Sequence, residues 1–148
     1  MSKRILLSSP HMSDEGYELE YIHDAFRKNW IAPLGENVNE FEKAMGGFMG
    51  KSYPVALSAG TAALHLSMIL AGVQPGDTVF CQSLTFSASA NPVAYCGAKP
   101  VFIDSERETW NMDPAALRRA FELYNKPKAV VVVHLYGNPA KLDEISAI

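Results

Sequence analysis

The sequence predicts an α/β fold in which a mostly parallel sheet is flanked by helices. From residue 52 onward, short β-rich runs alternate four times with helical stretches. This order is typical of parallel strands joined by right-handed crossovers. The run AVVVV at residues 129–133 is apolar at every position, as expected of a strand covered on both faces. With 148 residues, 48% of them hydrophobic, the chain can bury a sizeable core.

Two amphipathic helices are predicted before this alternation. The first covers residues 13–29, behind Ser13 as a candidate N-cap. The loop WIAPLGEN then breaks the pattern, and residues 38–49 again place apolar side chains on one helical face. These helices and the loop between them are expected to form an N-terminal arm, residues 1–50.

The alternating part predicts four strand and helix pairs, and we expect it to form the first part of one α/β domain, residues 51–148. The expected strands are 53–58, 77–83, 99–104 and 128–137, and the expected helices are 61–72, 86–98, 113–125 and 139–148.

Charge and composition exclude several classes of function. The 13 basic and 16 acidic residues give a net charge of −3 without a basic run, which argues against nucleic-acid binding. Two cysteines in apolar segments and four scattered histidines favour a reduced, cytoplasmic protein without a structural metal. No apolar stretch approaches the roughly 20 residues of a membrane span. The expected partners are therefore small molecules or proteins.

The turn SAGT, residues 58–61, lies where the first predicted strand meets a helix. The first N–H groups of a helix have no partner within the helix, and that end carries about half a positive charge. Gly60 leaves room for a close approach, and Ser58 and Thr61 add hydroxyl groups, so the turn suits a phosphate. The alternative is that Ser58 or Thr61 merely caps the helix.

Three further side chains follow the predicted strands, where an open α/β sheet binds ligands. Phe86 could stack on an aromatic ring or plug the crevice as part of the core. Asp104 could face a ligand or cap the following turn, and His134 is a candidate at the end of the fourth strand.

The order of several segments resembles one known family. NWIAPLGENVNEFE, LSAGTAALHLSMILAGVQPGD, QSLTFSASANPVAYCGAKPVFID, TWNMDP and VVVVHLYGNPAKLDEI together resemble the N-terminal portion of the DegT/DnrJ/EryC1/StrS aminotransferases. These are fold type I enzymes that use pyridoxal phosphate to aminate keto sugars on nucleotide carriers. SSPHMS, NWIAPLGE and HLYGNPAKLDEI are most similar to the branch acting on UDP-4-keto-6-deoxy-N-acetylhexosamines, as in bacillosamine synthesis for surface glycans and protein glycosylation.

The resemblance implies roles for particular residues. Gly60 and Thr61 would bind the cofactor phosphate, and Phe86 would cover one face of the pyridine ring. The loop along the nucleotide sugar would be Asn29, Trp30, Ile31 and Ala32. The family is dimeric, and its usual amine donor is glutamate.

The family's Schiff-base lysine, its acidic segment for the pyridine nitrogen and its small C-terminal domain would all follow residue 148. We therefore expect a truncated large domain without a catalytic residue, inactive alone and belonging to a longer polypeptide or completed by other chains. In the resembled fold we expect strands 53–58 and 129–134 to pair neither with each other nor with the middle two strands.

Other functions stay open at this point. A sugar dehydratase of the same family would differ at the absent lysine position. A non-catalytic module could hold a nucleotide or phosphate at the SAGT turn. A dinucleotide-binding oxidoreductase is disfavoured because the sequence has no G-x-G-x-x-G motif.

Overall fold

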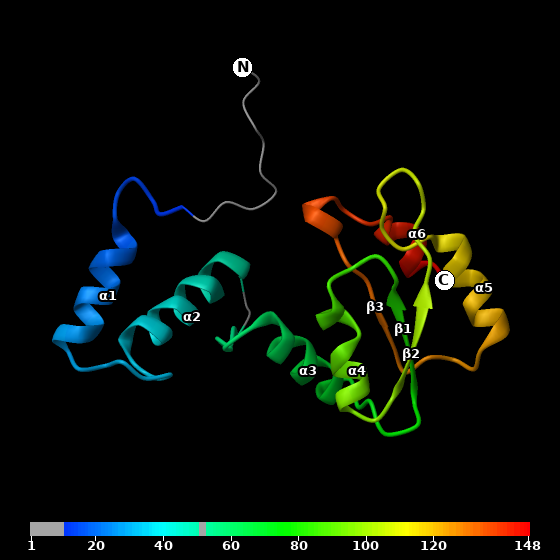
Figure 1. Ribbon diagram of the computed structural model, residues 1–148, viewed down its shortest axis with the longest axis horizontal. Helices are drawn as coiled ribbons and strands as arrows, with labels where there is room; N and C mark the ends of the chain where they lie inside the picture. The colour runs from blue at the N-terminus through cyan, green and yellow to red at the C-terminus, as the bar shows by residue number, and fades with distance from the viewer. Residues whose placement is uncertain (1–10, 51–52) are drawn as a thin grey trace, which may run out of the picture. The chain divides into compact units, whose positions relative to one another are not determined.

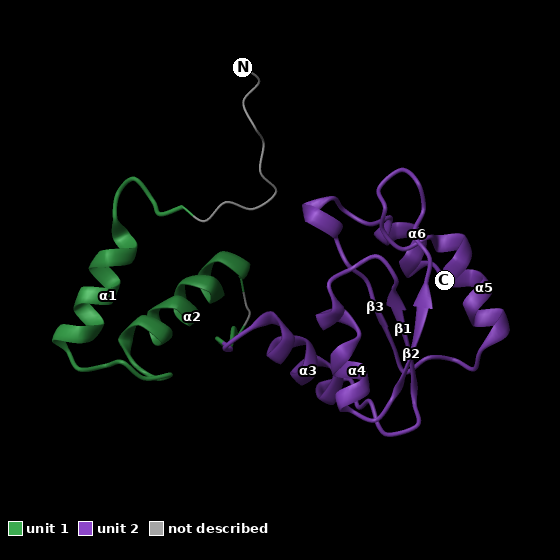
Figure 2. Cartoon of the chain, viewed as in Figure 1, with its two compact units in different colours: residues 1–56 green, residues 57–148 purple. Residues whose placement is uncertain are grey.

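The structure is a computed structural model that describes residues 11–50 and 53–148. The chain divides into two compact units, Met1–Ala56 and Leu57–Ile148, which are coloured separately in Figure 2.

The first unit contains helices α1 (Tyr17–Arg27) and α2 (Glu36–Met49). The expectation that Ser13 caps the first helix is wrong, because α1 begins after Gly16, whose φ of 73° turns the chain into the helix. The backbone N–H and the hydroxyl of Ser13 instead donate to the carboxylate of Glu18, at 2.8 and 2.6 Å. Neither helix contains a buried residue, so this unit lacks a packed core of its own in the described residues.

The second unit is built on a parallel sheet of β1 (Thr78–Gln82), β2 (Lys99–Ile103) and β3 (Ala129–Val131). The strand order is β2-β1-β3, as Figure 1 shows. Phe80 at the centre of β1 lies opposite Val101 of β2 and Val130 of β3. β1 is therefore the central strand, and its side chains alternate between two covered faces.

Helices cover both faces of this sheet (Figure 1). On one face, α3 (Gly60–Leu70) and α4 (Asn91–Tyr95) pack through Met68 and Val93 against Val79 and Cys81. On the other face, α5 (Pro114–Leu123) and α6 (Leu142–Ser146) pack around Phe80. Two short 3-10 turns, η1 (Ser87–Ser89) and η2 (Leu135–Gly137), follow β1 and β3. The predicted fold class, a mostly parallel sheet flanked by helices, is confirmed.

One expectation about a strand and one about strand pairing are wrong. Residues 53–58 do not form a strand in the structure, and Tyr53 is 97% exposed, because no described strand lies beside this segment to share ladder hydrogen bonds. The run 129–134 does pair with the middle strands, since β3 lies parallel to β1. The apolar side chains Val130 and Val131 gain two-sided burial from that pairing.

Candidate functional site

The second unit has an open pocket of about 720 Å³ at the carboxyl edge of its sheet. Three segments line the pocket: the start of α3, the loop after β1 and the turn after β3. Ligands of open α/β proteins bind at this edge because the loops that leave parallel strands converge there. The residues that line the pocket include Gly60, Thr61, Leu64, Leu84, Thr85, Phe86, Ala88, Ser89, Val133, Leu135 and Tyr136.

The N-terminus of α3 borders this pocket with backbone N–H groups that have no partner within the helix. Ala59 is the N-cap in extended conformation, and no side chain caps the helix, so the interpretation of Ser58 or Thr61 as a mere cap is wrong. The first backbone bond of α3 runs from Ala63 N–H to the Ala59 carbonyl, at 3.1 Å. The preceding N–H groups of the first turn have no acceptor within the helix. A Cβ at Gly60 would meet no atom within 4 Å, so the approach to these donors is open.

Phe86 lies on the loop after β1, immediately before η1. Its side chain is 79% exposed and lines the same pocket as Gly60. The interpretation of Phe86 as a core residue is therefore wrong for this unit. On either side of Phe86 in the sequence, the hydroxyls of Thr85 and Ser89 share a hydrogen bond of 2.8 Å, which connects the loop to the end of η1.

Asp104 and His134 are not among the residues that line this pocket. The Asp104 carboxylate accepts a hydrogen bond from the N–H of Ser105 at 2.8 Å. Nδ1 of His134 accepts from the N–H of Ala140 at 3.0 Å. Both side chains therefore shape the loops that leave β2 and β3.

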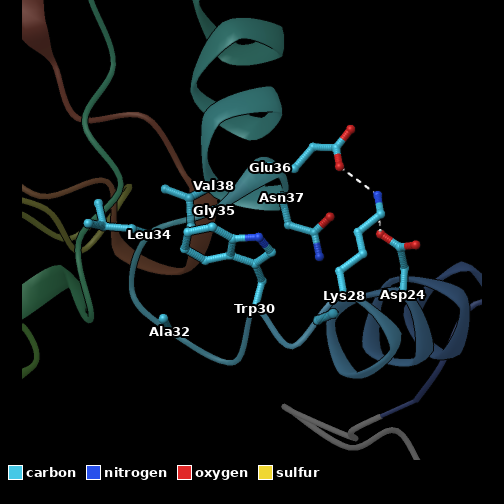
Figure 3. A pocket seen from close by; sticks show the side chains of 10 residues that line it. Asp24, Lys28, Trp30, Ala32, Leu34, Gly35, Glu36, Asn37 and Val38 are labelled. Atoms are coloured by element: carbon cyan, nitrogen blue, oxygen red, sulfur yellow. Dashed lines mark hydrogen bonds and ion pairs between the residues drawn. The ribbon is translucent and has the colours of Figure 1, made fainter.

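The loop of Asn29, Trp30, Ile31 and Ala32 belongs to the first unit, between α1 and α2. Asn29 has a φ of 54°, and the N–H of Trp30 donates to the Ala25 carbonyl at 2.9 Å. Figure 3 shows the indole of Trp30 beside Gly35, where an added Cβ would lie 3.5 Å from the ring. Trp30 and Ile31 remain 54% and 65% exposed.

An ion-pair cluster fixes the two sides of this loop. Nζ of Lys28 lies 2.6 Å from Oε2 of Glu36 and 2.9 Å from Oδ2 of Asp24, as Figure 3 shows. The hydrogen bond with Glu36, followed by that with Asp24, raises the pKa of Lys28. Lys28 therefore joins the end of α1 to the start of α2 across the loop.

Two kinds of feature are absent from the described part of the chain. Residues 11–50 and 53–148 contain no group of three or more His, Cys, Asp or Glu side chains that could hold a metal ion. Within the same ranges, no helix has the length and apolar character needed to cross a bilayer.

A parallel α/β sheet with a helix N-terminus that no side chain caps and an exposed aromatic ring at its carboxyl edge is typical of proteins that bind small molecules. A comparison with known protein families narrows this class of proteins to one family. Residues 13–148 match the DegT/DnrJ/EryC1/StrS aminotransferase family, and the chain belongs to this family.

Individual relatives agree with this assignment. EpsN of Bacillus subtilis (strain 168) is 54% identical over 152 aligned residues, which cover 100% of this chain and 39% of EpsN. GDP-perosamine synthase of Caulobacter vibrioides is 39% identical and covers 96% of this chain and 37% of its own length. The chain thus spans well under half the length of these relatives.

The solved structure of Spr1654 from Streptococcus pneumoniae, in its PMP form, superposes with a TM-score of 0.84 at 28% identity. The match covers 99% of this chain and 36% of Spr1654. The family and this structure together indicate pyridoxal phosphate as the cofactor.

The structure brings Gly60, Thr61 and Phe86 around one pocket, although Phe86 lies 25 or more residues further along the chain. Tyr136 and the pair Thr85 and Ser89 are lining residues that the sequence did not predict. Gly137 is a turn signal in the sequence, but the place of this turn at the pocket depends on the pairing of β3 with β1.

Proposed function

We propose that this chain supplies the cofactor phosphate and ring sites of a pyridoxal phosphate-dependent aminotransferase that acts on a nucleotide-linked keto sugar. The observation that carries the proposal is the meeting of an uncapped helix N-terminus and an exposed phenyl ring at one pocket of about 720 Å³. A phosphate ester on a flat ring needs an anion site and an apolar face in the same pocket.

The residues present fit this cofactor. The N–H groups at the start of α3 would bind the phosphate, since they are free of intrahelical acceptors and lie at the positive end of the helix dipole. Gly60 leaves the space that a phosphate oxygen would occupy, and the Thr61 hydroxyl adds one donor. Phe86 would cover one face of the ring and exclude water from it.

Bound pyridoxal phosphate supplies an electron sink for the carbon from which a proton is removed. The residues of this chain would bind and orient it, since the residues that line the pocket include no Lys, His, Asp or Glu. The resemblance also implies a Schiff-base lysine, a glutamate donor and a homodimer. We include these three features in the proposal.

The substrate loop is proposed from the resemblance and from its exposure. Asn29, Trp30, Ile31 and Ala32 would lie along the nucleotide sugar, and the exposed indole of Trp30 could stack on a base or a sugar face. The Caulobacter relative is named for a GDP-linked sugar, whereas the sequence resemblance favours a UDP-4-keto-6-deoxy-N-acetylhexosamine. A titration of UDP and GDP against the wild type and Trp30→Ala would separate the two nucleotides.

The cofactor site is tested with pyridoxamine phosphate, which binds without a covalent bond to the protein. Calorimetric titration of the full-length protein should show binding, and Phe86→Ala should weaken it about tenfold through the loss of ring contact. Because Phe86 is exposed, the thermal midpoint should change little.

Phe48→Ala is the matched control, since Phe48 is an 87% exposed phenylalanine of α2 in the other unit. It should leave the affinity for pyridoxamine phosphate unchanged. Unfolding of Phe86→Ala with an unchanged affinity would instead identify Phe86 as a packing residue, and a wild type that does not bind pyridoxamine phosphate would refute the proposed function.

A further inference from the structure

Tyr136 is an unusual residue at the edge of the proposed cofactor pocket. It lines the pocket together with Phe86 and Thr61, and its side chain is 88% exposed. Its backbone has φ 53° and ψ 27°, in the left-handed region that a bulky residue rarely adopts. Such strain persists only where surrounding structure enforces it, and it gathers at binding and catalytic sites.

The enforcing group is the buried side chain of Asn111, which is 0% exposed. Its Oδ1 accepts from the N–H of Leu135 at 2.8 Å, and its Nδ2 donates to the carbonyl of Asn138 at 2.8 Å. One amide therefore holds both ends of the Leu135–Asn138 turn. Within the turn, the N–H groups of Gly137 and Asn138 donate to the carbonyls of His134 and Leu135, each at 3.0 Å.

A second buried amide holds Asn111 in place. Gln82, at the end of β1, is also 0% exposed. Its Oε1 accepts from the N–H of Met112 at 2.9 Å, and its Nε2 donates to the Leu84 carbonyl at 2.9 Å. The two amides thus connect the loops that leave β1, β2 and β3. Buried amides that satisfy this many backbone groups set loop geometry, because an unmade bond at such a site is costly.

We propose that Tyr136 is a further ligand-binding residue of the cofactor pocket, which it lines together with Phe86, and that Asn111 is the positioning residue that presents it. The proposal rests on the proposed function, because the ligand is the phosphorylated pyridine that the pocket is inferred to bind. Tyr136 adds a second aromatic surface and a phenolic donor, whereas Asn111 acts only through the backbone of the turn.

The contact of Tyr136 with the ligand is measured by calorimetric titration of pyridoxamine phosphate into the full-length protein. Tyr136→Ala should weaken binding about tenfold, in keeping with one lost aromatic contact. Tyr136→Phe should show how much of the affinity depends on the hydroxyl. Tyr53→Ala is the matched control, since Tyr53 is 97% exposed and is not among the residues that line this pocket; it should leave the affinity unchanged.

The positioning role of Asn111 is measured by a double-mutant cycle with Asn111→Ala and Tyr136→Ala. If Asn111 acts through Tyr136, Asn111→Ala should weaken binding about fivefold in the wild type and less than twofold in Tyr136→Ala. A purely structural role would lower the thermal midpoint equally in both backgrounds and would give the same fold-change in affinity in both, which would overturn the positioning role.

A second measurement does not depend on the folding of Asn111→Ala. Glycine tolerates a positive φ, whereas alanine does not, so Tyr136→Gly should melt at a higher temperature than Tyr136→Ala. The ordinary order, alanine above glycine, is expected at Tyr53. A higher melting temperature for Tyr136→Ala than for Tyr136→Gly would contradict a strained backbone at position 136.

The outcomes separate this proposal from the proposed function. If the wild type binds pyridoxamine phosphate and Phe86→Ala weakens binding while Tyr136→Ala does not, the ligand contact of Tyr136 is wrong and the cofactor site stands. A lower melting temperature with unchanged affinity would mean that Tyr136 packs against protein. If the wild type does not bind, the cofactor site and the Tyr136 contact both fail, and the melting order still reports on the turn.

Discussion

Glu106 shows how one carboxylate organises the loop that follows β2. Its two oxygens accept hydrogen bonds from the N–H groups of Glu108 and Thr109, both at 2.8 Å, and from the Thr109 hydroxyl. Nζ of Lys141, just before α6, lies 3.5 Å from Glu106 and 2.7 Å from Glu108. The Thr109 hydroxyl and then the backbone N–H of Glu108 lower the pKa of Glu106 from 4.5 to about 2.

This shift predicts a pH dependence of stability. Because the folded pKa is lower than the unfolded value, the contribution of Glu106 is present above pH 4.5 and is lost as the pH falls toward 2. Glu106→Gln should therefore lower the free energy of unfolding at pH 6 and approach the wild type near pH 2. Urea denaturation between pH 2 and 7 measures this difference.

Glu122→Gln is the control for this pH series. Glu122 forms an exposed pair with Arg119, at 3.4 Å, and surface pairs contribute little. The free energy of unfolding of Glu122→Gln should therefore equal that of the wild type at every pH. Parallel curves for Glu106→Gln and the wild type over the whole range would contradict the role of Glu106.

At the scale of an element, α5 has the clearest local start signal in the described chain. Asp113 is the N-cap, its Oδ1 accepts from the N–H of Ala115 at 2.8 Å, and Pro114 takes the first helical position. The N–H of Asp113 also donates to the Asp104 carbonyl at 2.9 Å, so the cap anchors the helix to the end of β2. Leu117 and Ala120 then pack under the sheet.

Removal of this cap should destabilise α5. Asp113→Ala leaves the N–H of Ala115 without its acceptor, and we expect the free energy of unfolding to fall by about 1 kcal/mol. Asp113→Asn keeps the capping oxygen and should stay within a few tenths of a kcal/mol of the wild type. Urea unfolding followed by circular dichroism distinguishes the two variants, and an equal loss in both would show that the charge, not the cap, matters.

At the scale of the whole molecule, the two units differ in how much of their surface is buried. In the second unit, Val79, Phe80 and Cys81 of β1 are 0% exposed, between helices on both faces. In the first unit, no residue of α1 or α2 is buried. Local stability follows buried contacts, so the second unit should be the more stable of the two.

Hydrogen exchange on the chain of residues 1–148 tests this difference. The amides of β1 should exchange at least about a hundredfold more slowly than those of α1 and α2. Amides that exchange at the same rate in both units would contradict the prediction. Addition of pyridoxamine phosphate should slow the exchange of amides near the start of α3, in the second unit. The exchange of amides in α1 should slow less.

Local patterns predicted much of this architecture. The helical spacing of apolar residues located the main helices, and Asp113 followed by Pro114 marks the start of α5. The prediction that Ser13 caps the first helix was wrong, because α1 begins after the turn at Gly16. Residues 53–58 were predicted as a strand but do not form one, because a strand exists only where a neighbour pairs with its backbone.

The sequence by itself determined the alternation of strands and helices, the fold class and the family, since hydrophobic period, turn residues and motif order are properties of short segments. The tertiary structure decided that β3 pairs with β1, and it brought Gly60, Phe86 and Tyr136 to one pocket. It also placed the amides of Gln82 and Asn111 in the interior. These features depend on contacts between residues 20 to 50 or more positions apart, which only the packed chain selects.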